Sequence, residues 1–579
     1  MGLIFYGINV KINLLTKPRL ANILYSKNMP LSQILTKKEE AVFTPNENAK
    51  KLFQVIYQEK NKPEAESDDT PKIKVSELIS KLAFYYEKIR NSVDYKEEYL
   101  LRKNSILRNL KRQIILEAPL KNLNPEDIAR NLLVELIRAG YLTNNKLPES
   151  KIGELAAVVD KYLKLRALAL PQLAKEKEKN QIGKWILALA ASEIEARLNP
   201  DPVLATVVSN MYELLAANIV LPDDSPFQAD REIQIYIGIH RIFLKFDFDM
   251  LEFLLLKYYN ANWLQAGEAE IKYLANHLEA VKQTIGEQMH HPLANQLNKI
   301  ISRYAVYFTI LKDIVADDPV GVYEGLTDDP KAFPRLVKKF AQKKYHEAKV
   351  KLRRAAVRSI IYIFLTKMIL AFILEVPVTN WLGEALNYNS LAINITFPPL
   401  LLFLIVLFTR TPSEANTQKI VQGVEEVIFK EKARSEPWFL RQPSERRRGI
   451  STAFAVIYAI TFFITFGLVI YLLDKLQFNF LSIIIFLFFL TLVSFFSLRI
   501  RKVAREMYIV ERRDNILSFV ADFFYVPIVE VGKWLNEKFS RLNFLVFILD
   551  FIIEAPFKIF VDIAEEWTKY VKERKEEIM

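Results

Sequence analysis

The chain has 579 residues, of which 51% are hydrophobic and 25% are charged, and its formal net charge is +12. This length exceeds what one core can hold. The average composition fits neither a soluble enzyme nor a set of membrane spans alone, so we expect a polar part joined to an apolar part. The chain contains no cysteine. Disulfides, thiol catalysis and cysteine-ligated metals are therefore excluded.

The excess positive charge lies in one short block. Residues 1–330 contain 43 basic and 43 acidic side chains, whereas residues 331–358 contain eleven basic side chains and Glu347 as their single acid. A nucleic-acid-binding protein usually spreads basic residues over its folded part. The distribution therefore argues against a nucleic-acid partner.

The first half of the chain is predicted to be a flexible arm followed by helices. Residues 1–75 are expected to form an N-terminal arm and a disordered linker, because the stretch EKNKPEAESDDTPK is charged, contains proline and is almost free of apolar residues. Helical periodicity starts at Ser76, and we expect residues 76–330 to form one soluble all-α domain. Within it, a long helix from 230 to 260 is apolar on most faces and is expected at the centre.

Four apolar segments are long enough to cross a bilayer whose hydrocarbon core is about 30 Å thick. They are residues 359–376, 391–408, 452–473 and 478–498. We therefore predict a four-span membrane domain at 359–498, with residues 409–451 as a link between the second and third spans. The block at 331–358 is expected to be a basic juxtamembrane helix that continues directly into the first span.

Basic residues are distributed unevenly around these spans. They are frequent before the first span, in the link and after the fourth span, whereas residues 378–390 contain none and residues 474–477 contain only Lys475. Because basic flanks of membrane spans stay in the cytoplasm, this alternation predicts that the helical domain and both termini are cytoplasmic. The lysine- and isoleucine-rich composition favours a bacterial plasma membrane.

The C-terminal part, residues 499–579, has a different pattern. The stretches 516–539 and 542–567 are each apolar, but each is interrupted by acidic residues and a proline. Such segments more often lie in the membrane interface or fold back than span the bilayer, so we predict interfacial or re-entrant amphipathic helices. A fifth and a sixth span are the alternative.

Three polar side chains in the first two spans are the intramembrane site candidates. Lys367 lies in the middle of the first span, where a lysine costs about 2.5–3.5 kcal/mol on insertion scales. Glu375 is two turns further on, too far for an unaided pair, and Asn394 lies in the second span. Glu375 also begins a Glu-x-Pro sequence that ends in Pro377, and we expect the helix to leave the membrane there.

The basic block supplies candidates for binding acidic lipid headgroups. Each basic side chain near an anionic leaflet contributes about 1 kcal/mol to binding. The candidates are Lys338, Lys339, Lys343, Lys344, Arg353, Arg354 and Arg358.

The sequence assigns no chemistry. It contains no phosphate-binding glycine loop, no HExxH helix and no GxSxG elbow, so we assign no catalytic residue, metal ligand or cofactor. The leading interpretation is a polytopic membrane protein that anchors a large helical domain. It would act as a scaffold, assembly or partner-binding element, with a protein partner or self-association through residues 76–330. One alternative is a transporter or channel component with a polar site between the first two spans. The other is a membrane enzyme that uses 230–260 or 277–291.

Overall fold

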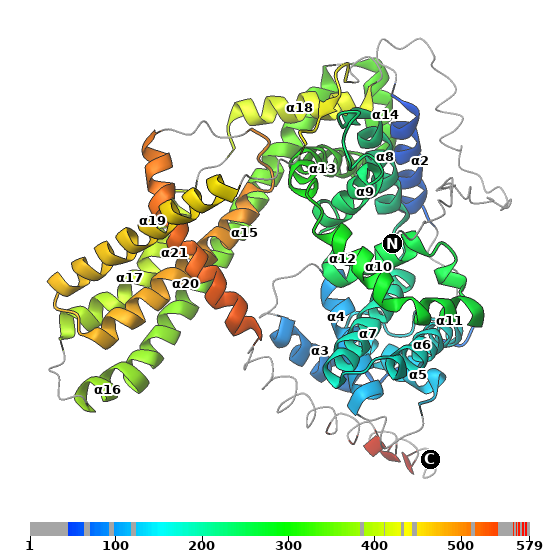
Figure 1. The fold of residues 1–579 in the computed structure, drawn as a ribbon. Coiled ribbons are helices and arrows are strands. Elements are labelled where there is room, and N and C mark those ends of the chain that lie inside the picture. The colour runs from blue at the N-terminus through cyan, green and yellow to red at the C-terminus, as the bar shows by residue number, and fades with distance from the viewer. Residues whose placement is uncertain are drawn as a thin grey trace, which may run out of the picture.

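A computed structural model (Figure 1) describes most of the chain. The described residues are 45–62, 70–91, 98–116, 123–329, 331–381, 387–409, 412–429, 434–442, 448–510, 516–541 and helical positions at 560, 563, 566–567, 570–571 and 574–575. The predicted all-α class is confirmed, because these residues are almost entirely helical. Their only strands are β1, Ile219–Val220, and β2, Trp438–Phe439, which pair in parallel.

A first hydrophobic core is enclosed by helices from the first half of the chain. These are α4 (Glu98–Lys111), α5 (Pro125–Arg138), α6 (Ser150–Ala169), α7 (Glu176–Leu198), α10 (Phe248–Tyr259), α11 (Glu268–Asn276) and α12 (Leu278–Met289), with short 3-10 turns at Leu170–Gln172 and Trp263–Gln265 and a π-helical turn at Arg112–Leu116. Helix α3 (Glu77–Asn91) packs against α5. Local sequence determines the start of α5, where the Asn124 side chain accepts the backbone N–H of Glu126 and Pro125 occupies the first turn.

A second hydrophobic core lies beside the first. It is formed by α2 (Glu47–Lys60), α8 (Pro202–Asn218), α13 (Ala294–Asp317), α14 (Pro319–Asp328), the first half of α15 (Ala332–Leu370) and α18 (Glu414–Ile428). Helix α9 (Arg231–Ile242) separates the two cores. Its Ile233 and Ile237 pack in the first core, and its Ile235 and Ile239 pack in the second. The central position expected for this apolar helix is confirmed.

Two segments that we expected to be peripheral contribute helices to the second core. The described part of residues 1–75 contains α2, with Leu52 and Phe53 buried, and the link at 409–451 contains α18, with Ile420 and Val424 buried. The sequence shows that each of these helices has one apolar face. It does not show what covers that face, because α2 packs on α8 and α18 packs on α13, and both partners are distant in the chain. Residues 1–44 and 63–69 lie outside the described residues.

The long helix expected from 230 to 260 is two helices. The chain leaves α9 after Ile242, Lys245 adopts a left-handed backbone conformation with φ 56°, and Asp247 caps α10 by accepting the N–H of Met250. The buried ammonium of Lys103 holds Asp247 and Asp249 at 2.7 and 2.6 Å. Periodicity alone missed this break, because the apolar pattern on both sides of it is helical.

Helix α15 passes from the second core into the predicted membrane region. The π-helical turn Ala371–Glu375 and α16 (Val376–Trp381) continue it, so one helical segment covers 50 residues. Near its start, Val337 and Phe340 are buried in the second core, whereas Ile363 and Lys367 are buried much further along among other apolar helices. The same rod is therefore part of two separate packing units.

Four helical segments are long and apolar enough to cross a membrane. These are the one that contains α15 and α16, α17 (Tyr388–Leu407), most of α19 (Arg448–Lys475) and most of α20 (Phe480–Arg505). Helices α15, α17 and α20 pack against one another, α21 (Ile516–Arg541) packs against α20, and α19 packs against α21. We call this assembly, on the left of Figure 1, the membrane bundle.

The first of the two C-terminal stretches is a continuous helix. Helix α21 contains Pro527 but does not fold back within its described length. Gly532 lets it approach α20 closely, because a Cβ at this position would collide with the carbonyl oxygen of Thr491. The second stretch, 542–567, falls mostly outside the described residues, so its prediction stays a prediction.

All three basic flanks lie at the same end of the bundle. The block before the first span is part of α15, the link returns as α18 to the second core, and Ile509, after α20, is buried in that core as well. The connection between α16 and α17 and the connection between α19 and α20 meet at the opposite end of the bundle. There Asn387 Nδ2 donates to the carbonyl of Gln477 at 3.4 Å. The alternation of basic and non-basic links therefore matches the two ends of the bundle.

Asn416 joins three chain segments where the domain meets the bundle. Its Nδ2 donates to the Tyr345 hydroxyl of α15 and to the Met507 carbonyl, both at 2.9 Å. Its Oδ1 accepts the backbone N–H groups of Ile509 at 2.8 Å and Val510 at 3.1 Å. The side chain is buried, so these four bonds replace all of its contacts with water.

We expect Asn416→Ala to destabilise this junction by about 3 kcal/mol, because it leaves buried backbone N–H groups without an acceptor. The measurement is the Tm of the full chain in detergent together with the rate of trypsin cleavage after Arg505. The exposed Gln418→Ala is the matched control and should change neither. Equal behaviour of the two variants would contradict the role given to Asn416.

His240 is buried between the two cores and makes the stability of the domain depend on pH. Burial, aided by the charge of Lys257 and opposed by a bond from Nδ1 to the Tyr236 carbonyl, lowers the pKa of His240 from 6.5 to about 4. The unfolded chain takes up this proton near pH 6.5. The stabilisation is therefore complete above that pH and is lost as the pH falls towards 4.

The unsubstituted chain should lose up to about 3 kcal/mol of unfolding free energy between pH 6.5 and 4 through His240, a value obtained from the pKa difference. We expect this loss to be absent in His240→Gln. The measurement is urea unfolding, followed by tryptophan fluorescence, at a series of pH values. His277 makes the same bond to the carbonyl four residues earlier but is exposed. His277→Gln should leave the pH dependence unchanged, and a flat profile for the unsubstituted chain would refute the prediction.

Candidate intramembrane polar site

The three intramembrane candidates lie inside the bundle. Lys367 and Asn394 are fully buried, and Glu375 is 1% exposed. Lys367 and Glu375 come from the helical segment that begins with α15, and Asn394 comes from α17. The structure thus places all three side chains in the packed region of the first, second and fourth spans.

The carboxylate of Glu375 is held through one oxygen. Its Oε1 accepts Asn394 Nδ2 at 2.7 Å and the Ser482 hydroxyl of α20 at 2.6 Å. Asn394 Nδ2 also donates to the Ser482 carbonyl at 3.3 Å. Charge-assisted bonds of this kind are strong in a medium of low polarity. Glu375 is therefore the centre of a contact that joins three spans.

Three polar atoms at the site have no hydrogen-bond partner among the described residues. They are Lys367 Nζ, Glu375 Oε2 and Asn394 Oδ1. The Lys367 ammonium lies 4.3 Å from the ring centroid of Phe489 on α20, and Glu375 acts on it through charge without an ion-pair contact. A cation–π contact and a more distant carboxylate compensate a buried ammonium only in part.

A π-helical turn determines where Glu375 points. Pro377 has no N–H and crowds the carbonyl of the preceding turn, and the helix accommodates it with the wider turn Ala371–Glu375. The helix then continues to Trp381. Our expectation that Pro377 ends this helix is therefore wrong, and the extra residue of the π turn rotates the Glu375 side chain into the bundle.

Hydroxyl and amide side chains that were not expected from the sequence complete the site. Ser482 bonds Glu375, Asn479 caps α20 by accepting the Ser482 N–H at 2.7 Å, and Asn479 Nδ2 donates to Thr379 Oγ1 at 3.3 Å. Small polar residues are common in spans, so they carry little signal. A usable signal was that Asn479 and Ser482 have the spacing of an N-terminal cap and lie within an apolar run.

The headgroup candidates differ in their contacts. Lys338 pairs with Glu414 at 2.6 Å, and Lys344 pairs with Asp313 at 2.5 Å, so both fasten α15 to the domain. Lys343 lies 5.6 Å from the ring centroid of Phe340. The remaining candidates are exposed, namely Lys339, Arg353, Arg354 and Arg358.

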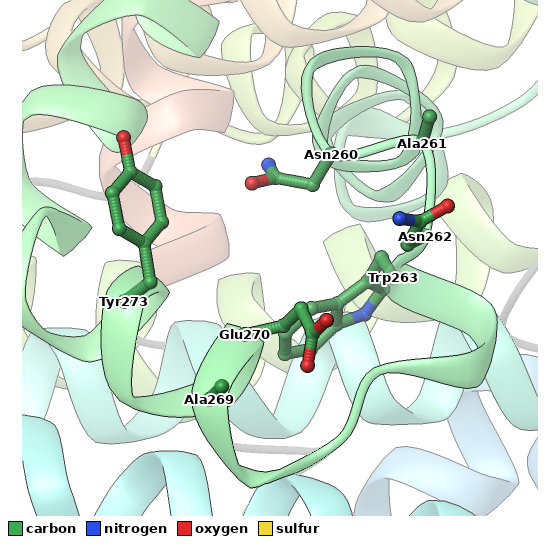
Figure 2. Close-up of a pocket in the computed structure, with 7 residues that line it drawn as sticks. All are labelled: Asn260, Ala261, Asn262, Trp263, Ala269, Glu270 and Tyr273. Atoms are coloured by element: carbon green, nitrogen blue, oxygen red, sulfur yellow. The ribbon is translucent and has the colours of Figure 1, made fainter.

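A hollow of about 350 Å³ opens on the first core (Figure 2), lined by Asn260, Ala261, Asn262, Trp263, Ala269, Glu270 and Tyr273. The acidic and basic groups at and beneath it have partners. Glu270 caps α11 through the N–H of Gly267, and the Trp263 carbonyl accepts from Lys161, which also bonds the buried Glu193. These bonds fasten the 260–266 loop to α6 and α7, and they leave no buried acid or base free for catalysis among the described residues at this hollow.

The histidine-containing stretch 277–291 does not assemble a metal centre. Among the residues that the structure describes, no three His, Asp or Glu side chains are grouped so that they could hold a metal ion. His291 instead lies 3.4 Å from Asp230, and its ring packs edge-on against Phe227.

Comparisons with known proteins add no further assignment. No family model, curated protein or solved structure matches the chain.

We expect Lys367 and Glu375 to be energetically coupled, because each substitution alone leaves the opposite charge uncompensated in the bundle. In a double-mutant cycle, Lys367→Met and Glu375→Gln should show a coupling free energy of about 1–2 kcal/mol. The measurement is SDS-induced unfolding of the full chain. Lys475→Met, at the end of the third span, is the control and should be additive with Glu375→Gln, and additivity of the first pair would contradict the coupling.

Proposed function

We propose that this protein is a scaffold in the membrane, which holds a large helical domain in a fixed position for a protein partner. The partner binds through residues 76–330, or a second copy of the chain takes its place. The observation that carries the proposal is the junction between domain and bundle. There α15, α18 and the segment after α20 all enter the second core.

This junction supports a scaffold because it restricts motion. A domain on a single flexible linker samples many orientations, whereas this domain is attached at three places and around one continuous helix. At about 1.5 Å per residue, the 50 residues from Ala332 to Trp381 correspond to a rod of about 75 Å. A partner bound to the domain would therefore be held at a defined distance and angle from the bilayer.

The basic flanks support a position on the cytoplasmic face of a bacterial plasma membrane. We propose that exposed Arg353, Arg354 and Arg358 of α15, together with Arg499 and Lys502 of α20, contact anionic headgroups. These residues extend from the domain end of the bundle, where the positive-inside rule requires cytoplasm. In this placement both termini are cytoplasmic.

The two alternatives have less support. A membrane enzyme needs uncommitted acids or bases in a pocket, but the buried Glu193 and Lys103 and the half-buried Glu252 all have hydrogen-bond or ion-pair partners. A transporter needs a polar site in the bundle, and the side chains around Glu375 supply one. That site does not explain a domain as large as this one, so we keep the scaffold as the main function.

The partner can be captured at exposed aromatic side chains of the domain. We expect a photo-crosslinking amino acid at Tyr85, Phe248 or Tyr273, which are 63%, 65% and 61% exposed, to give a discrete protein adduct in native membranes. Mass spectrometry identifies the adduct and separates a partner from a second copy. Phe439, 73% exposed but in the link, is the matched control and should give none.

Absence of an adduct at all three domain positions would contradict partner binding through residues 76–330. The side of the membrane is checked in the same cells with single cysteines, because the native chain has none. An impermeant thiol reagent added outside should label Trp381→Cys and should not label Gln418→Cys. The reverse pattern would place the domain outside and refute the proposed orientation.

A further inference from the structure

A line of polar side chains leads from the end of the bundle opposite the domain towards Glu375. It begins at the short connections, where Asn387 bonds the Gln477 carbonyl and the Ser390 hydroxyl donates to the Asn387 carbonyl at 2.8 Å. Thr379 and Ser482 follow deeper in the bundle, both nearly fully buried. Asn479 connects them, since it donates to Thr379 and accepts the Ser482 N–H. The line ends at Glu375, Asn394 and Lys367.

The unpartnered atoms lie at the inner end of this line. Lys367 Nζ can donate, while Glu375 Oε2 and Asn394 Oδ1 can accept, and none of them has a hydrogen bond among the described residues. Buried polar atoms of a folded protein are nearly always satisfied by protein or by ordered water. A donor and two acceptors at one site match water, which both donates and accepts.

The other side of Lys367 is apolar. Ile363, Leu402 and Val493, one from each of α15, α17 and α20, form a buried cluster, against which Ile360 and Ile500 also pack. This cluster lies between Lys367 and the basic end of the bundle, because Ile363 is one turn before Lys367 and Ile500 is at the end of α20. Polar groups are therefore found on one side of the site, and apolar packing closes the other.

We propose that this line is a one-sided entry for water and protons, open to the side opposite the helical domain and ending at Lys367 and Glu375. The proton is taken up by Glu375 at Oε2, since Oε1 already accepts two bonds. One O–H bond forms at Oε2 and one O–H bond of the hydronium that delivers the proton breaks, so the carboxylate becomes a carboxylic acid and the hydronium becomes water. The Ile363–Leu402–Val493 cluster prevents the proton from continuing to the domain side.

The helices that pack around the site supply no second buried acceptor for the proton within the described bundle. Helix α17 contains no Asp, Glu, His, Lys or Arg, and α20 contains none before Arg499, which lies at its basic end. On α21, which packs against α20, the charged side chains Asp522, Glu530, Lys533, Glu537 and Lys538 are exposed, as are Asp474 and Lys475 at the end of α19. Lys367 and Glu375 are therefore the buried charged groups of the described bundle.

The cysteine-free chain allows a direct test by single-cysteine accessibility in right-side-out and inside-out membrane vesicles. Thiols react with small, charged methanethiosulfonate reagents only where water reaches them. We expect Thr379→Cys, Ser390→Cys and Ser482→Cys to react from the side opposite the domain, at least tenfold faster than Ile363→Cys, Leu402→Cys and Val493→Cys. From the domain side, all six positions should be unreactive.

Two controls define the scale of reactivity. Trp381→Cys, at the exposed end of α16, sets the rate in water, and Phe463→Cys, 74% exposed in the middle of α19, sets the rate at a surface that faces lipid. Each variant is used only if its Tm and elution volume match those of the unsubstituted chain. Path positions that react no faster than Phe463→Cys would overturn the entry, and labelling of the apolar cluster from the domain side would overturn its closure.

The proton is tested separately by infrared difference spectroscopy. Lowering the pH on the side opposite the domain should raise a protonated carboxyl band that is missing in Glu375→Gln, while lowering it on the domain side should not. Glu530→Gln, on the exposed face of α21, is the control and should keep the band. A band that persists in Glu375→Gln would place the proton elsewhere and refute the assignment. This result does not depend on whether photo-crosslinking finds a partner of the helical domain.

Discussion

The architecture depends on the continuity of helix α15 through two environments. The same backbone presents Val337 and Phe340 to the second core of the domain and Ile363 and Lys367 to the membrane bundle. Because an α-helix fixes the angle between successive side chains, the packing of one end determines which residues face inwards at the other end. The π turn before Pro377 then changes this angle once, and that change brings Glu375 to Asn394 and Ser482. Without a continuous rod, the domain and the intramembrane site would be independent units.

The domain and the bundle treat buried charge in different ways. In the domain, Arg102 forms a two-pronged pair with Glu195 at 2.8 and 2.6 Å, and Lys161 divides its bonds between Glu193 and the Trp263 carbonyl. Burial raises the pKa of Glu195, and the adjacent Arg102 opposes this effect. Such paired charges specify packing and leave nothing for a ligand. In the bundle, where desolvation costs more, Lys367 Nζ and Glu375 Oε2 lack hydrogen bonds to the described residues. The unpaired polar atoms of the bundle can therefore bind a ligand such as water, whereas the paired charges of the domain stabilise its packing.

Much of the fold could be predicted from the sequence, and the rest required knowledge of distant contacts. The four spans follow from long apolar runs, and the common end of the basic links follows from charge counts, because both are properties of local composition. The roles of α2 and α18 could not be predicted, since their partners on α8 and α13 are remote in sequence. The break between α9 and α10 was missed because the apolar pattern on both sides of it is helical, and the Lys103 ammonium that holds Asp247 and Asp249 lies far away in the chain.

The site shows the same division. Lys367, Glu375 and Asn394 could be named from the sequence because polar side chains of this kind are costly within apolar runs. Their mutual arrangement could not, because it depends on the π turn, and Pro377 read by itself predicts the end of a helix. Ser482 and Thr379 were invisible, since a hydroxyl in a span can also bond the carbonyl four residues earlier in its own helix, as Thr461 does with Ile457. The hydroxyl of Ser482, unlike that of Thr461, bonds a carboxylate that another span brings to it. The information that makes it part of a site therefore lies in the packing of α20 against α15.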